Sequence, residues 1–215
     1  MAGGSLPTRK RRPHRRDEIL GAAAALFQEK GFESTGIDDI GAAIGMTGPA
    51  VYRHFSSKQD ILETLVVSRG EQTLAAMRAT VAEGEKDEPE ETLRRLVDQY
   101  ATAIAASPAA VVVATYERRT LGVETRRTLD RFEKENIATW VQLVGELRPE
   151  LIPAEVRTLV NAALSMGVAV ANFESGLEWA EVRDLVSGML LDALGVSRRG
   201  PVQPNRRAGR GPARR

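Results

Sequence analysis

The stretch TGIDDIGAAIGMTGPAVYRHFSSK, residues 35–58, decides the fold of this chain. Its first half carries apolar residues every three or four positions, as an amphipathic helix does: Ile37, Ile40 and Ile44. Thr35 precedes this helix as its cap, and Gly45 can adopt the positive φ that a tight turn needs. Thr47 then caps a second short helix, with Pro49 in its first turn, where a missing N–H costs little. Two short helices joined by a tight turn predict a helix-turn-helix, in which the second helix faces the major groove of DNA.

Helical periodicity continues on both sides of this stretch. It predicts a helix over 15–30 that stops at Gly31, and a long helix over 58–83 that Ser57 caps. Further helices are predicted over residues 90–106, 108–121, 124–147, 154–175 and 178–195, with Pro or Gly at the joints between them. The apolar residues do not recur with the period of two that marks a strand. The predicted fold is therefore all-α, with a small N-terminal unit at 15–64 and a larger helical domain at 65–195.

The charges of the 215-residue chain are divided unevenly, although 30 Lys and Arg nearly balance 29 Asp and Glu. Residues 1–16 carry six basic side chains and no acid, and residues 196–215 carry seven arginines and no acid. The body between them holds 17 basic and 29 acidic side chains. Residues 1–14 and 196–215 are predicted to be disordered basic arms. Such arms either bind an anionic partner, nucleic acid or a membrane surface, or serve only to keep the chain soluble.

The composition excludes several classes of protein. Without Cys the chain has no disulfide, thiolate nucleophile or cysteine-ligated zinc, and His14 and His54 are too far apart for a histidine-rich metal site. No apolar run approaches the ~18 residues of a membrane span, and no apolar segment follows the basic N-terminus as in a signal peptide. We therefore expect a cytoplasmic protein with no cofactor, no metal and no membrane partner. We also expect no enzyme, because no carboxylate pairs with a base and no phosphate-cradling loop or nucleophile elbow is present.

Positions within the opening stretch also match a known family. The spacing of Ile40, Gly45, Thr47-Gly48, Tyr52, His54-Phe55 and Lys58 resembles the signature of the tetracycline-repressor-like (TetR) family of transcription regulators. The resemblance covers roughly residues 15–65. It implies a three-helix DNA-binding domain at 15–64, followed at 65–195 by a ligand-binding and dimerisation domain.

Two features depart from the family pattern. Gly41 stands where members often have Ala, which predicts a slightly looser second helix. Residues 17–64 carry eight acids against three basic groups, a poor balance for binding DNA. The basic residues 1–16 offset that acidity, which favours a role in DNA binding for this arm.

The resemblance implies roles for individual residues at the DNA. Thr35 would offer its hydroxyl to a phosphate, and Lys58 would reach another. Tyr52 and His54 would also bind phosphates, while Arg53 would read a base edge, since arginine suits guanine. The implied DNA-binding residues are Arg15, Thr35, Thr47, Gly48, Pro49, Ala50, Tyr52, Arg53, His54 and Lys58. The alternatives are structural roles for Tyr52 and His54 and a solvated charge at Arg53.

A homodimer held by the last two helices is implied as well. Apolar stripes on these helices predict the interface, and the alternative is that they face the protomer's own core: Leu159, Ala163, Met166, Val170, Phe173, Val182, Leu185, Val186 and Met189. The predicted effector is a small molecule, hydrophobic or acyl-type. Its candidate contacts on the middle helices, each of which could instead be core, are Met77, Tyr100, Tyr116, Arg119, Phe132 and Trp140.

The predicted function is a DNA-binding regulator, most simply a repressor that a small molecule releases from a pseudo-palindromic operator. Double-stranded DNA, an effector and a second copy of the chain are the expected partners. The alternative is a helical adaptor whose basic tails bind membrane or RNA, with a helix-turn-helix that is purely structural.

Overall fold

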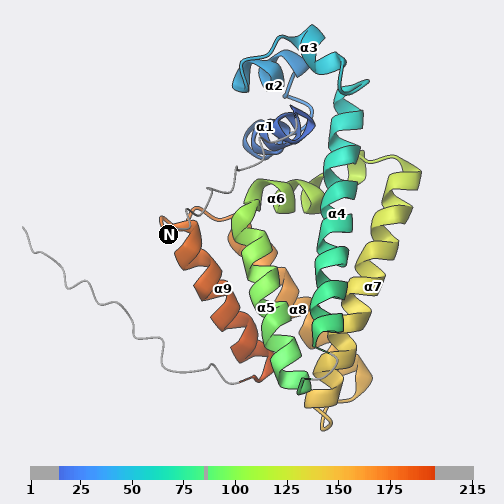
Figure 1. Cartoon of the computed structure of the whole chain (residues 1–215), viewed down its shortest axis with the longest axis vertical. Helices are drawn as coiled ribbons and strands as arrows, with labels where there is room; N and C mark the ends of the chain where they lie inside the picture. The colour runs from blue at the N-terminus through green and yellow to red at the C-terminus, as the bar shows by residue number, and fades with distance from the viewer. Residues whose placement is uncertain (1–14, 85–86, 197–215) are drawn as a thin grey trace, which may run out of the picture.

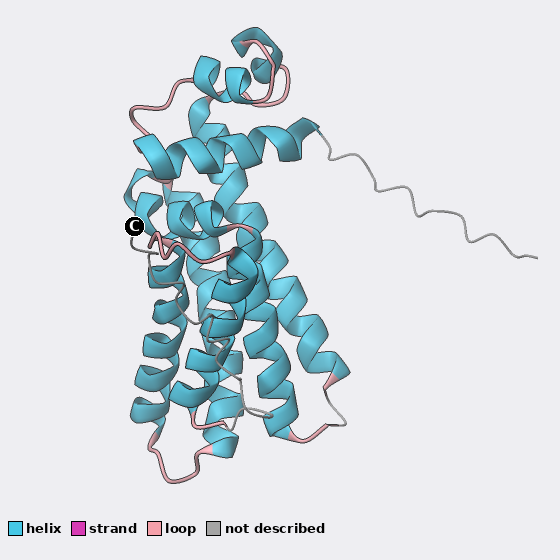
Figure 2. Ribbon diagram, turned by 90° about the vertical axis from the view of Figure 1, so that its left-hand side faces the viewer, coloured by secondary structure: helices cyan, strands magenta, loops and turns pink. Residues whose placement is uncertain are grey.

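The computed structural model describes residues 15–84 and 87–196, and the regular structure in these ranges is all helical (Figure 2). The elements are α1 (Arg15–Lys30), α2 (Ile37–Ala43), α3 (Gly48–Tyr52), α4 (Lys58–Glu83), α5 (Pro89–Ala106), α6 (Pro108–Tyr116), the 3₁₀ turn η1 (Glu117–Thr120), α7 (Val123–Leu147), α8 (Pro153–Ala171) and α9 (Trp179–Leu194). The predicted all-α fold is confirmed, and α1 and α4 have the predicted bounds. The basic arms predicted at 1–14 and 196–215 lie outside the described residues, except for Val196.

Local signals set most of these boundaries. Ser57 caps α4 through its hydroxyl, which accepts a hydrogen bond of 3.0 Å from the backbone N of Asp60. Three glycines have φ near +70° to +80°, a conformation that costs glycine nothing: Gly31 ends α1, Gly45 ends the α2 turn and Gly195 ends α9. Where helices end in such local chemistry, the sequence predicts them well.

Two predicted helices are shorter than expected. The helix over 108–121 is α helical only as far as Tyr116, and its last turn is the 3₁₀ segment η1. The helix predicted over 154–175 ends at Ala171, because Asn172 leaves the helical conformation before the turn at Gly176. At neither of these helix ends does a side chain predict that the helix stops.

The helices pack around two hydrophobic cores. One core joins α1, α2, α3 and the start of α4, with Ile19, Ile40 and Phe55 almost fully buried. It also includes Ala110 and Val113 of α6, so the N-terminal unit rests on the larger domain through α6. The second core fills the bundle of α4, α5, α7, α8 and α9. The long helix α4 belongs to both cores and runs from the helix-turn-helix down into the bundle (Figure 1).

One straight helix among the described residues, α8, is long and apolar enough to cross a membrane by length and composition, a test that core helices of soluble proteins also pass. The bent pair formed by α5 and the segment Pro108–Thr120, which meet at 92°, passes the same test together. Both belong to the helical bundle, where α8 packs on α7 and α9 and α5 packs on α9. Only 28% of the apolar stretch of α8 is buried within the protomer, so this helix has an unusually free outer face.

Candidate nucleic-acid interface and ligand cavity

The turn between α2 and α3 is held by a close backbone contact. The N–H of Met46 donates a 2.8 Å hydrogen bond to the carbonyl of Gly41. A methyl group on Gly41 would lie 2.7 Å from the carbonyl oxygen of Met46, nearer than a carbon atom can approach. Glycine at 41 therefore tightens this turn. The expected loosening of the second helix is wrong for this chain.

The first turn of α3 carries most of the exposed residues predicted to face DNA. Thr47, the N-cap, and Pro49 are exposed, and Ala50 is partly exposed. Tyr52 closes the helix with 55% of its surface exposed, and Arg53 follows it at the surface. A buried structural role for Tyr52 does not fit this exposure. These side chains lie at the outer end of the molecule, where α2 and α3 form its tip (Figure 1).

Among the α3 residues predicted to face DNA, Gly48 is the exception, because it is buried. A Cβ atom there would overlap the carboxylate of Asp38 on α2, at 2.1 Å from its Oδ1. The absence of a side chain thus lets Asp38 lie against the start of α3. Gly48 contributes to helix packing and not to an exposed groove-facing surface.

Thr35 is not placed to bind a phosphate, contrary to expectation. Thr35 is only 1% exposed. Its hydroxyl donates to the carbonyl of Gly31 at 2.8 Å and to that of Leu26 at 3.2 Å. The hydroxyl therefore satisfies carbonyl groups at the end of α1. Gly36, and not Thr35, is the N-cap of α2, and its N–H donates to Asp39 at 2.9 Å.

Lys58 also points inward. Its ammonium donates to the carbonyls of Phe32 at 2.6 Å and Glu33 at 3.2 Å, and lies 4.4 Å from the centre of the Phe32 ring. Together these contacts tie the start of α4 to the connection between α1 and α2. In this conformation the ammonium of Lys58 binds backbone carbonyls, and its phosphate contact stays a prediction.

Arg16 has a role that the sequence reasoning missed. It donates from Nη1 to the carbonyl of His54 at 2.6 Å, and its guanidinium lies 4.2 Å from the centre of the Phe55 ring. Arg16 thereby fixes α1 against the end of the helix-turn-helix, while Arg15 pairs at the surface with Glu18 at 2.5 Å. His54 is half-buried beside it. The only sequence signal for this contact was the position of Arg16 at the start of a helix.

Several acids of the N-terminal unit serve its own backbone. Asp39 accepts from Gly36, and Asp60 accepts from the N–H of Ser56 at 2.8 Å. This backbone hydrogen bond, with help from the Ser56 hydroxyl, lowers the pKa of Asp60. The excess of acids over bases in residues 17–64 thus reflects, in part, helix caps.

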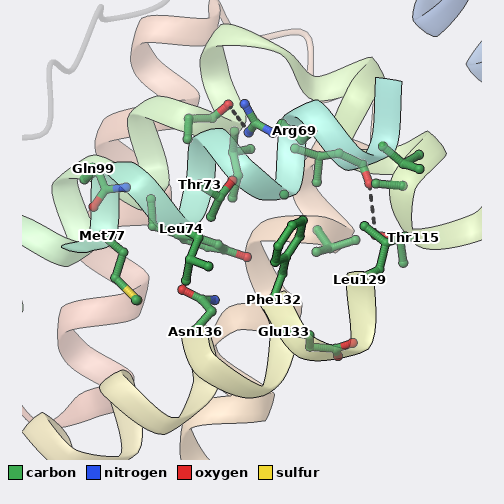
Figure 3. A pocket seen from close by; sticks show the side chains of 18 of the residues that line it. Arg69, Thr73, Leu74, Met77, Gln99, Thr115, Leu129, Phe132, Glu133 and Asn136 are labelled. Atoms are coloured by element: carbon green, nitrogen blue, oxygen red, sulfur yellow. Dashed lines mark hydrogen bonds between the residues drawn. The ribbon is translucent and has the colours of Figure 1, made fainter. Parts of the chain in front are cut away.

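A cavity of about 230 Å³ lies inside the bundle between α4, α5, α6 and α7 (Figure 3). Four of the six predicted effector contacts line it, namely Met77, Tyr100, Phe132 and Trp140. Polar residues that the sequence reasoning missed also face it, namely Arg69, Thr73, Gln99 and Asn136. An apolar cavity with a few polar groups suits a small organic molecule.

The polar groups of this bundle cavity are held firmly. Tyr100 donates to the carbonyl of Leu164 at 2.6 Å, its ring meets Trp140 edge-on at 6.0 Å, and burial raises the pKa of its phenol. Arg69 donates to the carbonyl of Ala103 at 2.7 Å, and burial lowers its pKa. The described residues give Arg69 no carboxylate partner.

The other two predicted contacts, Tyr116 and Arg119, lie outside the bundle cavity. They line a separate surface hollow together with Thr115, Arg118 and Arg126. We call this second site the arginine hollow. It shares Thr115 and Arg118 with the wall of the bundle cavity.

Hydrogen bonds connect α4 with η1 and with the start of α7, and connect η1 with the N-terminal unit. Gln59 on α4 donates to the carbonyl of Thr120 in η1 at 3.0 Å. Glu63 on α4 accepts from the N–H of Gly122 and from the hydroxyl of Thr125 at the start of α7, both at 2.8 Å. Gln59 donates to Glu63 at 2.8 Å, and this bond together with that from Gly122 lowers the pKa of Glu63. Glu117 in η1 accepts from the N–H of Phe32 at 3.3 Å.

The residues predicted for a dimer interface divide between core and surface. Ala163, Val182 and Val186 are buried in the protomer's own core, which was the alternative for these stripes. Phe173 is 68% exposed and Leu185 is 47% exposed. The remaining four are partly buried: Leu159, Met166, Val170 and Met189. The apolar residues predicted for each of the two helices therefore include some that face the protomer's core and some that face outward.

A family model described as bacterial regulatory proteins, tetR family, matches residues 19–65, which contain most of α1, all of α2 and α3, and the start of α4. Over these residues the chain is similar to the DNA-binding region of the TetR family. One relative, the HTH-type transcriptional repressor KstR2 of Rhodococcus jostii, is 33% identical over 114 residues, which span 53% of this chain and 55% of the relative. The chain thus matches little more than half of that relative's length.

Two solved structures share the TetR fold over nearly their whole length. The ketosteroid transcriptional regulator KstR2 of Mycobacterium tuberculosis aligns with a TM-score of 0.73 at 24% identity, over 86% of this chain and 95% of that one. AibR, whose structure contains isovaleryl coenzyme A and operator DNA, aligns with a TM-score of 0.63 at 22% identity, over 82% and 97%. At these identities the likeness concerns the fold.

Proposed function

We propose that the chain is a ligand-responsive repressor that binds a pseudo-palindromic operator as a homodimer and leaves it when a small molecule enters the bundle cavity. One observation carries this proposal. The helix α4 begins beside the helix-turn-helix, where Lys58 holds the α1–α2 connection, and lines the bundle cavity further along at Arg69, Thr73 and Met77. A molecule in the cavity therefore touches the helix that positions α3.

The DNA contact is assigned to the exposed end of α3. Small side chains at Thr47, Pro49 and Ala50 allow close approach of the backbone to base edges. Arg53 reads a base and Tyr52 fixes the register on a phosphate. As a binder of bacterial DNA, the protein acts in the cytoplasm as a regulator and not as an enzyme.

The dimer contact is assigned to α8 and α9. The free face of α8 carries small side chains at Ala162, Ser165 and Ala169, which permit close helix packing, and Leu185 of α9 and Phe173 expose apolar surface beside it. Dimerisation would set two α3 helices about one DNA turn apart, ~34 Å, as a palindromic site requires. A Leu185→Arg variant should be monomeric in analytical ultracentrifugation, while Val123→Arg, which charges an exposed valine on α7, should remain dimeric.

The effector acts by favouring a conformation with lower affinity for DNA. The route offered by the structure runs through η1. This segment contributes to the walls of the bundle cavity and the arginine hollow, and its Glu117 contacts Phe32. A shift of η1 would reach the N-terminal unit through this bond and reach α4 through the bond from Gln59 to Thr120.

The test begins with selection of an operator from random duplexes with the full-length protein. We expect a two-fold symmetric consensus, bound by one dimer with an affinity that falls as salt rises. Arg53→Ala should relax the consensus at one position per half-site. An asymmetric or absent consensus, or stronger binding to RNA or anionic vesicles than to any duplex, would refute the proposal and favour the adaptor.

A further inference from the structure

The bundle cavity and the arginine hollow lie side by side because they share two wall residues, Thr115 and Arg118. The cavity is largely apolar, with Leu74, Met77 and Trp140 among its walls. The hollow is more open to solvent, and three of its five wall residues are arginines. One molecule that passes Arg118 can therefore place an apolar part in the cavity and a polar part in the hollow.

The positive charges of the hollow are only partly balanced by carboxylates. Arg118 pairs with Asp130 and with Glu133, the latter at 3.1 Å. Arg126 donates to the carbonyl of Leu121, and the described part of the chain gives neither Arg126 nor Arg119 a carboxylate partner. The hollow therefore presents two uncompensated guanidinium groups.

The nearby acids are already engaged elsewhere. Glu117 accepts from Phe32 and Thr120, pointing to the N-terminal unit, and Glu124 pairs with Arg127 at 2.6 Å. Neither lines the hollow. Tyr116, 60% exposed, adds a bare aromatic ring to the same wall.

We propose that the effector is an amphipathic anion, with its apolar group in the bundle cavity and a phosphate-bearing head in the arginine hollow. This inference rests on the proposed function, since it names the ligand class of the same regulator. Several guanidinium groups spread over an open surface suit a multiply charged head, because each can bind phosphate oxygens through paired N–H groups. The exposed Tyr116 ring offers a planar base or ring of the head a face on which to stack.

The head would also lie where binding is transmitted. Arg119 belongs to η1, two residues after Glu117, which holds the N–H of Phe32 in the N-terminal unit. A phosphate on Arg119 therefore pulls directly on η1. An apolar molecule without a charged head fills the cavity but does not contact Arg119.

The test measures binding to the full-length protein without DNA, by titration calorimetry. The probes share one eight-carbon chain: octanoyl coenzyme A, octanoyl lysophosphatidic acid and free octanoate. We expect at least one phosphate-bearing probe to bind about tenfold or more tightly than octanoate. A preference for the thioester assigns the source to a nucleotide-carried acyl group, and a preference for the lysophosphatidic acid assigns it to a lipid.

A double variant isolates the head-group site. Arg119→Gln with Arg126→Gln should weaken binding of the phosphate-bearing probe by about tenfold and leave octanoate within twofold. The matched control, Arg127→Gln with Arg131→Gln on the same helix α7 but outside the hollow, should change neither. Equal binding of all three probes, or equal losses in both double variants, would overturn the inference.

The outcome is distinguishable from a failure of the proposed function. A phosphate-bearing probe that binds through Arg119 and Arg126 but leaves operator DNA bound supports the ligand class and refutes the release mechanism. Release of DNA by an uncharged apolar compound, insensitive to the double variant, refutes the ligand class and supports the regulator.

Discussion

Replacing Gly41 with alanine should destabilise the protein, although the same change at Gly21 should stabilise it. Alanine in the interior of a helix is favoured over glycine by about 1 kcal/mol. At Gly21 in α1 no atom lies within 4 Å of the added methyl group, so the variant keeps most of this gain. The change at Gly21 therefore measures helix propensity alone.

At Gly41 the added methyl group meets the carbonyl oxygen of Met46 at 2.7 Å and two further backbone carbons at 3.3 Å. These atoms belong to the main chain and cannot rotate away. To reach an ordinary contact the turn must open by about 0.7 Å, which strains the 2.8 Å hydrogen bond from Met46 to Gly41. Overpacking of this kind costs about 1–3 kcal/mol. After subtraction of the propensity gain, the Gly41→Ala variant should be neutral to about 2 kcal/mol less stable than the natural protein.

Thermal unfolding followed by circular dichroism compares the two variants. For a chain of this size each kcal/mol moves the midpoint by about 2–4 °C, so the two midpoints should differ by about 2–12 °C. Fluorescence anisotropy on the selected operator gives a second measurement, because an opened turn shifts α3 relative to α2. Equal midpoints for the two variants, with unchanged operator affinity for Gly41→Ala, would refute the reasoning.

Three further predictions concern single side chains. Lys58→Met should lower the unfolding midpoint and leave the salt dependence of DNA binding unchanged, since its ammonium binds backbone carbonyls; a shallower salt slope would show that it reaches a phosphate after all. Glu63→Gln should destabilise the protein at neutral pH, as shown by urea unfolding. Folding lowers the pKa of Glu63 from 4.5, so its stabilisation is present above that value and is lost as the pH falls through the lower folded pKa. The unfolding free energies of the variant and the natural protein should therefore converge in acid. A difference that stays constant with pH would contradict this. Tyr52→Phe should weaken binding to all duplexes alike, by an amount typical of one hydrogen bond, about 0.5–1.5 kcal/mol, whereas a loss confined to the selected operator would assign Tyr52 to base readout.

The sequence predicted the helices well and the directions of individual side chains less well. Caps such as Ser57 and the glycines that end helices act through neighbours in the chain, so their effect is visible in the sequence. Thr35 and Lys58 are different, because each can reach outward to a phosphate or inward to a carbonyl. The choice depends on carbonyl groups up to 26 residues away in the chain, which no local pattern reveals.

The same limit applies to the apolar stripes and the ligand cavity. On α9 the buried Val186 and the exposed Leu185 are adjacent in sequence and both apolar, so hydrophobicity alone does not separate core from surface. Three predicted aromatic residues and Met77 line the bundle cavity, and their contact with an effector stays a prediction. Arg69 was missed because an arginine on a long helix is ordinarily a surface charge, and only the packing of α5 shows that it is covered.

Because α4 is long, a small tilt at its cavity end produces a large sideways displacement at its other end. Between Met77, at the bundle cavity, and Lys58, beside the helix-turn-helix, the helix rises by about 28 Å at 1.5 Å per residue. A tilt of only about 7° about the cavity end would carry the other end sideways by about 3.4 Å, the rise of one base pair along a DNA strand. A small tilt of α4 at the cavity would thus suffice to take each α3 of the proposed dimer out of step with the base pairs it reads.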